Sequence, residues 1–142
     1  MRVALHTLPQ MAADVLEKLP AKPDGATMLF LQGELGAGKT TFTQALAREL
    51  GITEPVQSPT YVIMKSYPLS GQRFEALVHL DLYRIESPEE LAPLKLGRVF
   101  AKPKTLVVIE WPERAGGALP KADLSLRLSS DGAGESERHY HI

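Results

Sequence analysis

The chain has 142 residues, 44% of them hydrophobic and 23% charged, which suits one soluble globular domain with a real core. Sixteen basic and seventeen acidic residues give a formal net charge of −1. This balance argues against a protein that holds nucleic acid by itself through a basic surface. The absence of cysteine excludes disulfides and thiolate metal sites. No apolar run approaches the ~20 residues of a membrane span and no signal-peptide core is visible, so we expect a single cytoplasmic domain over residues 1–142.

The first predicted elements lead to a glycine-rich loop. Residues 7–19 have an apolar face at helical spacing, with Thr7 as the expected cap and Pro20 as the stop. Residues 27–32 are mostly apolar, as a buried parallel strand requires. Residues 40–50 repeat apolar side chains at helical spacing. The sequence therefore predicts a strand, a glycine loop and a helix in succession.

The loop between that strand and that helix, residues 33–40, reads G-x-x-x-x-G-K-T. In this context the pattern is typical of a P-loop, whose backbone N–H groups and following helix N-terminus bind phosphate. Lys39 is expected on the β- and γ-phosphates and the Thr40 hydroxyl on Mg²⁺. The predicted nucleotide-binding residues are Gly33, Gly36, Ala37, Gly38, Lys39, Thr40 and Thr41.

A proline-framed loop and two strands come next. Ser58 and Thr60 occupy the place where a P-loop protein can carry a switch that senses the γ-phosphate, although ordinary turn hydroxyls remain an alternative. Residues 62–67 and 76–84 read as strands joined by a short turn, which predicts an antiparallel pair. Asp81 is the one carboxylate in the second strand. It lies either at a solvated strand end or in a phosphate site.

The second strong signal is residues 105–112. Before this stretch, Ser87 is expected to cap the N-terminus of a short helix. Residues 94–100 form either another helical turn or a loop. Residues 105–109 are an unbroken run of β-branched residues and leucine that ends at Glu110, like a Walker-B strand that places a carboxylate beside the Mg²⁺ of Thr40. Trp111 either packs in the core, which is the default, or offers an aromatic surface.

The chain ends in a predicted hairpin. Residues 112–119 read as a short helix or turn. Residues 123–129 alternate polar and apolar side chains, and residues 136–142 form a final strand after a turn. We expect this hairpin at a sheet edge. The whole pattern predicts an α/β, P-loop nucleotide triphosphate hydrolase-like three-layer fold with a small mixed sheet.

Four separated stretches together resemble the TsaE (YjeE) family of bacterial P-loop ATPases. They are residues 33–41, Ser-Pro-Thr-Tyr at 58–61, His-Leu-Asp-Leu-Tyr-Arg at 79–84, and Ile-Glu-Trp-Pro-Glu-Arg at 109–114. The resemblance covers essentially the whole chain, although residues 91–104 match poorly. Glu34 and Tyr61 stand where Asp and Phe are common and keep their chemical character.

The resemblance implies slow, Mg²⁺-dependent ATP hydrolysis, needed to make threonylcarbamoyladenosine in tRNA. ATP is the substrate, the implied partners are the TsaD and TsaB proteins, and tRNA is met only indirectly. The implied residues are Lys39 and Thr40 in the phosphate loop, Ser58 and Thr60 in a switch, and Asp81, Glu110 and Trp111 in the site.

The residues leave some roles open. Asp81 or Glu110 orients the attacking water, and both could instead be metal ligands. Arg84 is the best internal candidate for an arginine finger, and an arginine from a partner is as plausible. A small P-loop kinase and a nucleotide-gated binding module without significant hydrolysis are the alternative functions. No N-K-x-D motif supports a GTPase.

Overall fold

The computed structural model describes residues 2–4, 8–33, 38–53, 64–129 and 137–141. Within them a sheet of seven strands is ordered β1-β7-β6-β2-β5-β4-β3. The elements in chain order are β1 (Arg2–Ala4), α1 (Leu8–Lys18), β2 (Thr27–Gln32), α2 (Lys39–Glu49), β3 (Met64–Pro68), β4 (Ala76–Asp81), the 3₁₀ helix η2 (Pro88–Leu94), α3 (Leu96–Phe100), β5 (Thr105–Glu110), the 3₁₀ helix η3 (Pro112–Ala115), β6 (Leu124–Ser129) and β7 (Glu137–His141).

The middle of the sheet is parallel. β2 pairs with β5 and with β6, and β5 pairs with β4, all in parallel. β3, β7 and β1 pair antiparallel with β4, β6 and β7 respectively. The carboxyl ends of the parallel strands therefore meet at one edge, where ligands bind in open α/β sheets.

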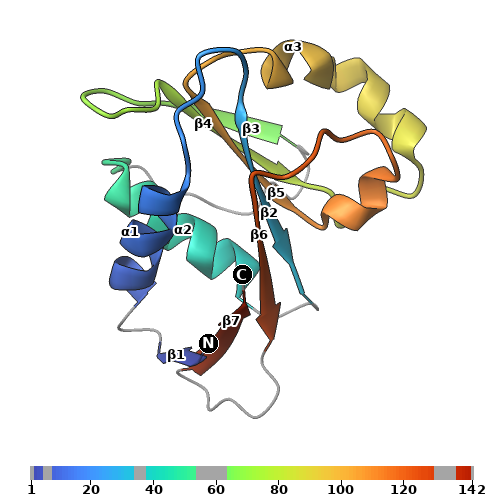
Figure 1. The fold of residues 1–142 in the computed structure, drawn as a ribbon. Coiled ribbons are helices and arrows are strands. Elements are labelled where there is room, and N and C mark those ends of the chain that lie inside the picture. Colours follow the sequence, from blue (N-terminus) through green and yellow to red (C-terminus); the bar gives the residue numbers. More distant parts are fainter. Residues whose placement is uncertain (1, 5–7, 34–37, 54–63, 130–136, 142) are drawn as a thin grey trace.

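Helices cover both faces of the sheet (Figure 1). On one face, α1 and α2 pack on side chains such as Leu29, Leu106 and Val108. On the other face, η2, α3 and η3 pack on Met28, Val107 and Ile109. β5 is buried along its whole length, as a strand covered on both faces must be. The predicted three-layer α/β fold with a mixed sheet is confirmed.

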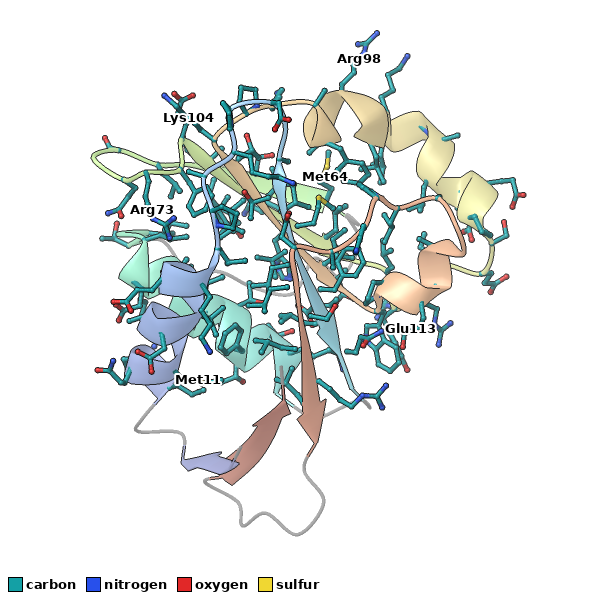
Figure 2. The ribbon with its side chains drawn as sticks, in the orientation of Figure 1. Met11, Met64, Arg73, Arg98, Lys104 and Glu113 are labelled. Atoms are coloured by element: carbon teal, nitrogen blue, oxygen red, sulfur yellow. The ribbon has the colours of Figure 1, made fainter. Side chains whose placement is uncertain are left out.

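A charged side chain from the loop before β4, Arg73, also contacts the end of α1. Arg73 donates hydrogen bonds to the backbone carbonyls of Leu16 and Leu19, at the C-terminal end of α1 (Figure 2). The last carbonyls of a helix have no partner within the helix, and a cation there also suits the helix dipole. Arg73 thus fixes the end of α1 to the sheet.

Several sequence expectations need correction. β1 was not predicted, because three residues are too few to show a period; it pairs with β7, so the C-terminal hairpin is not at the sheet edge. β4 ends at Asp81 rather than near residue 84, and residues 96–100, left open before, form α3. The short helix capped by Ser87 is confirmed as η2, with its capping box, but it continues through Pro93.

Other expectations fall on residues outside the described ones. Thr7, the start of the residue 62–67 strand and the turn between β6 and β7 belong to this group. In the described part of the chain, no helix combines the length and the apolar character needed to cross a membrane.

Candidate functional site

The site lies where β2 passes into α2. Gly38 precedes α2 with φ 101° and ψ 18°, a left-handed conformation that favours glycine. Its carbonyl accepts the amide of Phe42 at 2.9 Å, the first bond of the helix. Gly33, at the other end of the loop, also has a positive φ of 145°. β2 thus leads into Gly33 and α2 begins at Lys39, with the N-terminus of α2 facing the carboxyl edge of the sheet, whereas residues 34–37 of the predicted loop lie outside the described part of the chain.

Lys39 is buried rather than extended into solvent, with 5% of its surface exposed. Its Nζ donates a hydrogen bond to the Gly33 carbonyl at 2.6 Å and lies 4.2 Å from the centroid of the Trp111 ring. A carbonyl and an aromatic face both stabilise an ammonium group. The lysine charge is thus held between the Gly33 carbonyl at the end of β2 and the Trp111 ring that follows β5.

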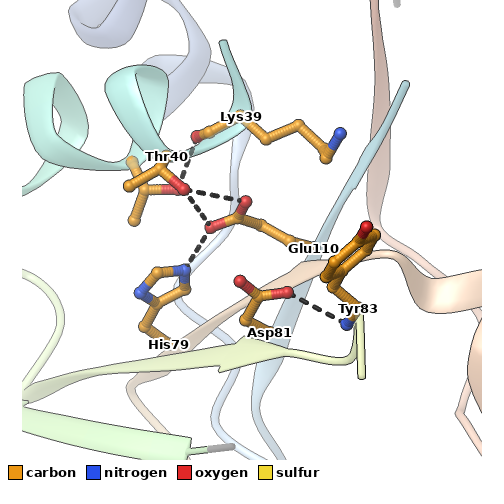
Figure 3. A network of polar contacts seen from close by, with 7 residues as sticks. Lys39, Thr40, His79, Asp81, Tyr83 and Glu110 are labelled. Atoms are coloured by element: carbon orange, nitrogen blue, oxygen red, sulfur yellow. Dashed lines mark hydrogen bonds and ion pairs between the residues drawn. The ribbon is translucent and has the colours of Figure 1, made fainter. Parts of the chain in front are cut away.

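Glu110 is the centre of the polar network. The carboxylate ends β5 and is 2% exposed. The Thr40 hydroxyl, from the first turn of α2, lies 3.1 Å from Oε1 and 3.3 Å from Oε2. The His79 ring, from β4, places Nε2 2.5 Å from Oε2 (Figure 3). A buried carboxylate is tolerated when it is hydrogen-bonded in this way.

Asp81 lies beside Glu110. The two residues are register partners on the neighbouring parallel strands β4 and β5, so both carboxylates are at the carboxyl edge and on the α2 face of the sheet. Asp81 is half-buried, and its Oδ1 accepts the backbone amide of Tyr83 at 3.1 Å in the turn that leaves β4 (Figure 3). The site therefore has two adjacent acids in different surroundings.

Trp111 follows Glu110 with a left-handed backbone, φ 61°. It is half-buried and packs against the core on the η3 face. Its ring lies 5.2 Å from the Tyr83 ring, and the Arg114 guanidinium lies 5.6 Å from both ring centroids. Core packing thus explains only one part of Trp111, because the ring also meets Lys39 and Arg114.

The oxygen atoms of the site suit a hard cation that binds together with a phosphate group. Thr40 and Glu110 offer oxygen atoms within hydrogen-bond distance of each other, and oxygen is the ligand that Mg²⁺ prefers. No cluster of three or more His, Cys, Asp or Glu side chains in the described residues could hold a metal alone. Mg²⁺ usually takes one or two protein oxygens together with substrate phosphate and water. The residues therefore fit a nucleotide-linked Mg²⁺.

The structure brings together most of the predicted site residues. Lys39, Thr40, Asp81, Glu110 and Trp111 gather at one end of the sheet. Thr41 is exposed in the first turn of α2, and Arg84 is exposed in the turn after β4. The predicted residues Gly36, Ala37, Ser58 and Thr60 lie outside the described part of the chain, so their roles stay predictions.

The sequence analysis assigned no role to three residues of the site. His79 is fully buried and contacts Glu110. The signal was available, because the strand alternation places His79 on the same side as Asp81. Tyr83 and Arg114 complete the aromatic and cationic group around Trp111. Their contacts depend on the turns after β4 and β5, which the pattern did not resolve.

Comparisons with known proteins identify a family and related chains. The family model "Threonylcarbamoyl adenosine biosynthesis protein TsaE" matches residues 5–140. A tRNA threonylcarbamoyladenosine biosynthesis protein TsaE from Haemophilus influenzae is 37% identical, over 82% of this chain and 70% of that protein. The protein of the same name from Bacillus subtilis is 39% identical, over 83% of this chain and 68% of that protein.

A solved structure is similar over nearly the whole chain. The crystal structure of Bacillus subtilis YdiB superposes with a TM-score of 0.70 at 30% sequence identity, covering 99% of this chain and 80% of that one. Together with the family match, this confirms the resemblance that the four sequence motifs indicated.

Proposed function

Since the chain belongs to the TsaE family, whose members take part in the biosynthesis of threonylcarbamoyladenosine in tRNA, we propose that it binds ATP with Mg²⁺ and hydrolyses it slowly. The observation that carries the proposal is the contact between the Thr40 hydroxyl and the Glu110 carboxylate. In P-loop proteins that act on nucleoside triphosphates, the loop threonine and the acid at the end of a buried parallel strand hold the Mg²⁺, and this contact supports the proposal.

The phosphates would bind between the ends of β2 and α2. The N-terminus of α2 supplies positive potential, and Gly38 leaves the backbone free to turn toward the anion. Lys39 is already held within this region by Gly33 and Trp111. Its charge would stabilise the β- and γ-phosphates, where negative charge changes during transfer.

We assign different tasks to the two acids. Thr40 and Glu110 would hold Mg²⁺, because they lie together and Glu110 is fixed by a second partner. Bound Mg²⁺ would neutralise charge on the transferred phosphoryl group. Asp81 would orient the attacking water, because it is adjacent to Glu110 and only half-buried.

Two variants separate these tasks. Glu110→Gln should abolish the increase in nucleotide affinity that Mg²⁺ gives, because it removes the charge while keeping the size. Asp81→Asn should keep that increase and lose phosphate release. The reverse result would exchange the two assignments.

Membership of the family supports a proposal about partners. We propose that the protein acts with TsaD and TsaB, that hydrolysis resets their complex between rounds of modification, and that tRNA is contacted only indirectly. The net charge of −1 is in keeping with an indirect role at tRNA. Arg84, Tyr83 and Arg114 are exposed on the side of the site that solvent reaches. A partner that covers this side could supply an arginine, or Arg84 could act itself, and either would accelerate a slow site by about 10³–10⁵.

Phosphate release by purified protein tests the proposal. The wild type should release phosphate from Mg²⁺-ATP, and Lys39→Ala should reduce the rate to background. Equal background rates with preserved nucleotide binding would instead indicate a nucleotide-gated module. Transfer of the γ-phosphate to a small acceptor would indicate a kinase.

A further inference from the structure

His79 is a buried titratable residue that the proposed mechanism has not used. It lies on β4, two residues before Asp81, and none of its surface is exposed. Its ring is on the α2 side of the sheet, since Asp81 and Glu110 are on this face. Burying an imidazole is unfavourable unless its nitrogen atoms are hydrogen-bonded. The interior position therefore requires an explanation.

The geometry of Nε2 supplies half of that explanation. Nε2 lies 2.5 Å from Oε2 of Glu110, a short distance for a hydrogen bond between nitrogen and oxygen. When Glu110 is ionised, as metal binding requires, Nε2 is the donor in this contact and Oε2 the acceptor. Nδ1 is buried and has no hydrogen-bond partner among the described residues. The ring is thus anchored by its contact with Glu110.

The carboxylate is held between two donors that come from different elements. Thr40 approaches from α2 and His79 from β4 (Figure 3). If His79 were removed, the Thr40 hydroxyl would be the remaining one of these two hydrogen-bond donors to Glu110. In the proposed function, that hydroxyl binds the metal instead. His79 would therefore keep the carboxylate in place when Thr40 exchanges its partner for a ligand.

We propose that His79 is a positioning residue for Glu110, which holds the carboxylate where it receives the nucleotide-linked Mg²⁺. This inference rests on the proposed function and extends it to a residue that contacts Glu110 from the interior. Groups that hydrogen-bond a metal-binding carboxylate fix its orientation, and their loss typically reduces metal affinity or activity by about 10–100-fold. Because His79 is fully buried and reaches the site only through Glu110, its removal should leave metal-free nucleotide binding unchanged.

The alternative is that His79 only fills space in the core. Two amide variants separate these roles. His79→Gln places an N–H at nearly the reach of Nε2, whereas His79→Asn carries the same amide but is too short to reach Oε2. Both replace a ring by a smaller polar group, so a loss caused by packing alone should affect them similarly.

The readout is the affinity for fluorescent N-methylanthraniloyl-ADP, measured with Mg²⁺ and with EDTA. For His79→Asn we expect the gain in affinity from Mg²⁺ to fall by at least tenfold, while the affinity in EDTA stays within twofold of wild type. For His79→Gln we expect the Mg²⁺ gain to stay within about threefold of wild type. Phosphate release should follow the same order, with the KM for Mg²⁺-ATP raised in His79→Asn, because slow turnover makes KM equal to the dissociation constant.

Three results would overturn the proposal. They are a wild-type Mg²⁺ gain in His79→Asn, an equal loss in both variants, and a loss in His79→Asn that appears equally in EDTA. Should His79→Asn not fold, the Gln variant decides alone, because a folded Gln variant without the Mg²⁺ gain contradicts the assignment and one that retains it supports it. If wild type releases no phosphate, hydrolysis fails as a function, but the Mg²⁺ gain still decides the role of His79.

Discussion

The contact between Thr40 and Glu110 can be tested without any nucleotide. Thr40→Val removes the hydroxyl and keeps the shape of the side chain, so Glu110 loses a donor while remaining buried. A hydrogen bond to an ionised group contributes about 1.5–3 kcal/mol to the free energy of unfolding. Thr40 is half-buried and shares one hydrogen between two oxygen atoms at 3.1 and 3.3 Å, so we expect the lower end, about 1.5 kcal/mol.

The assays are urea unfolding and thermal unfolding of the metal-free and nucleotide-free protein, both followed by circular dichroism. The loss of about 1.5 kcal/mol should lower the melting temperature by about 5 °C for a domain of this size. Thr40→Ser is the matched control, because it keeps the hydroxyl and loses one methyl group. If Thr40→Val is as stable as wild type, or if Thr40→Ser is destabilised equally, then the hydroxyl does not stabilise buried Glu110 and the reasoning is refuted.

Three further predictions concern the parts of the fold that hold the site. Leu106→Ala, in a fully buried position of β5, should lower the free energy of unfolding by about 2–5 kcal/mol, because it leaves a cavity in the core; urea unfolding measures this, and an effect below 1 kcal/mol would contradict the burial. Arg73→Ala should lower the free energy of unfolding by about 1–2 kcal/mol, since it removes donors from the carbonyls at the end of α1. Arg73→Lys keeps the charge but not the forked geometry, so it should recover only part of that loss. Equal stability of all three proteins would exclude this role of Arg73. Trp111→Leu should remove the cation–aromatic contact of Lys39, which is worth about 0.5–2 kcal/mol. The nucleotide affinity in EDTA should therefore fall by up to about 30-fold relative to Trp111→Phe. Identical affinities would show that the ring does not hold the lysine.

The sequence predicted the site best where local pattern and position in the sheet coincide. The glycine loop places Lys39 and Thr40 at the start of a helix, and an unbroken apolar run places Glu110 at the end of a buried strand. Since parallel strands present their carboxyl ends at one edge, these two local predictions already brought Thr40 and Glu110 together. The structure adds the distances between them.

What the sequence did not predict depends on contacts between distant segments or on single backbone angles. His79 reads as one polar residue in an alternating strand, and only the pairing of β4 with β5 shows that it meets Glu110. Trp111 reads as a core residue, and its left-handed backbone turns the ring toward Lys39. β1 has three residues and is defined by its partner β7.

The measurement that tests the central claim most directly is phosphate release from Mg²⁺-ATP by the purified protein, alone and with TsaB and TsaD added. We expect slow release by the protein alone, a clear increase with the pair, and loss of both in Lys39→Ala and Glu110→Ala. Release that does not respond to the pair, or that persists in both variants, would contradict a partner-coupled ATPase at this site.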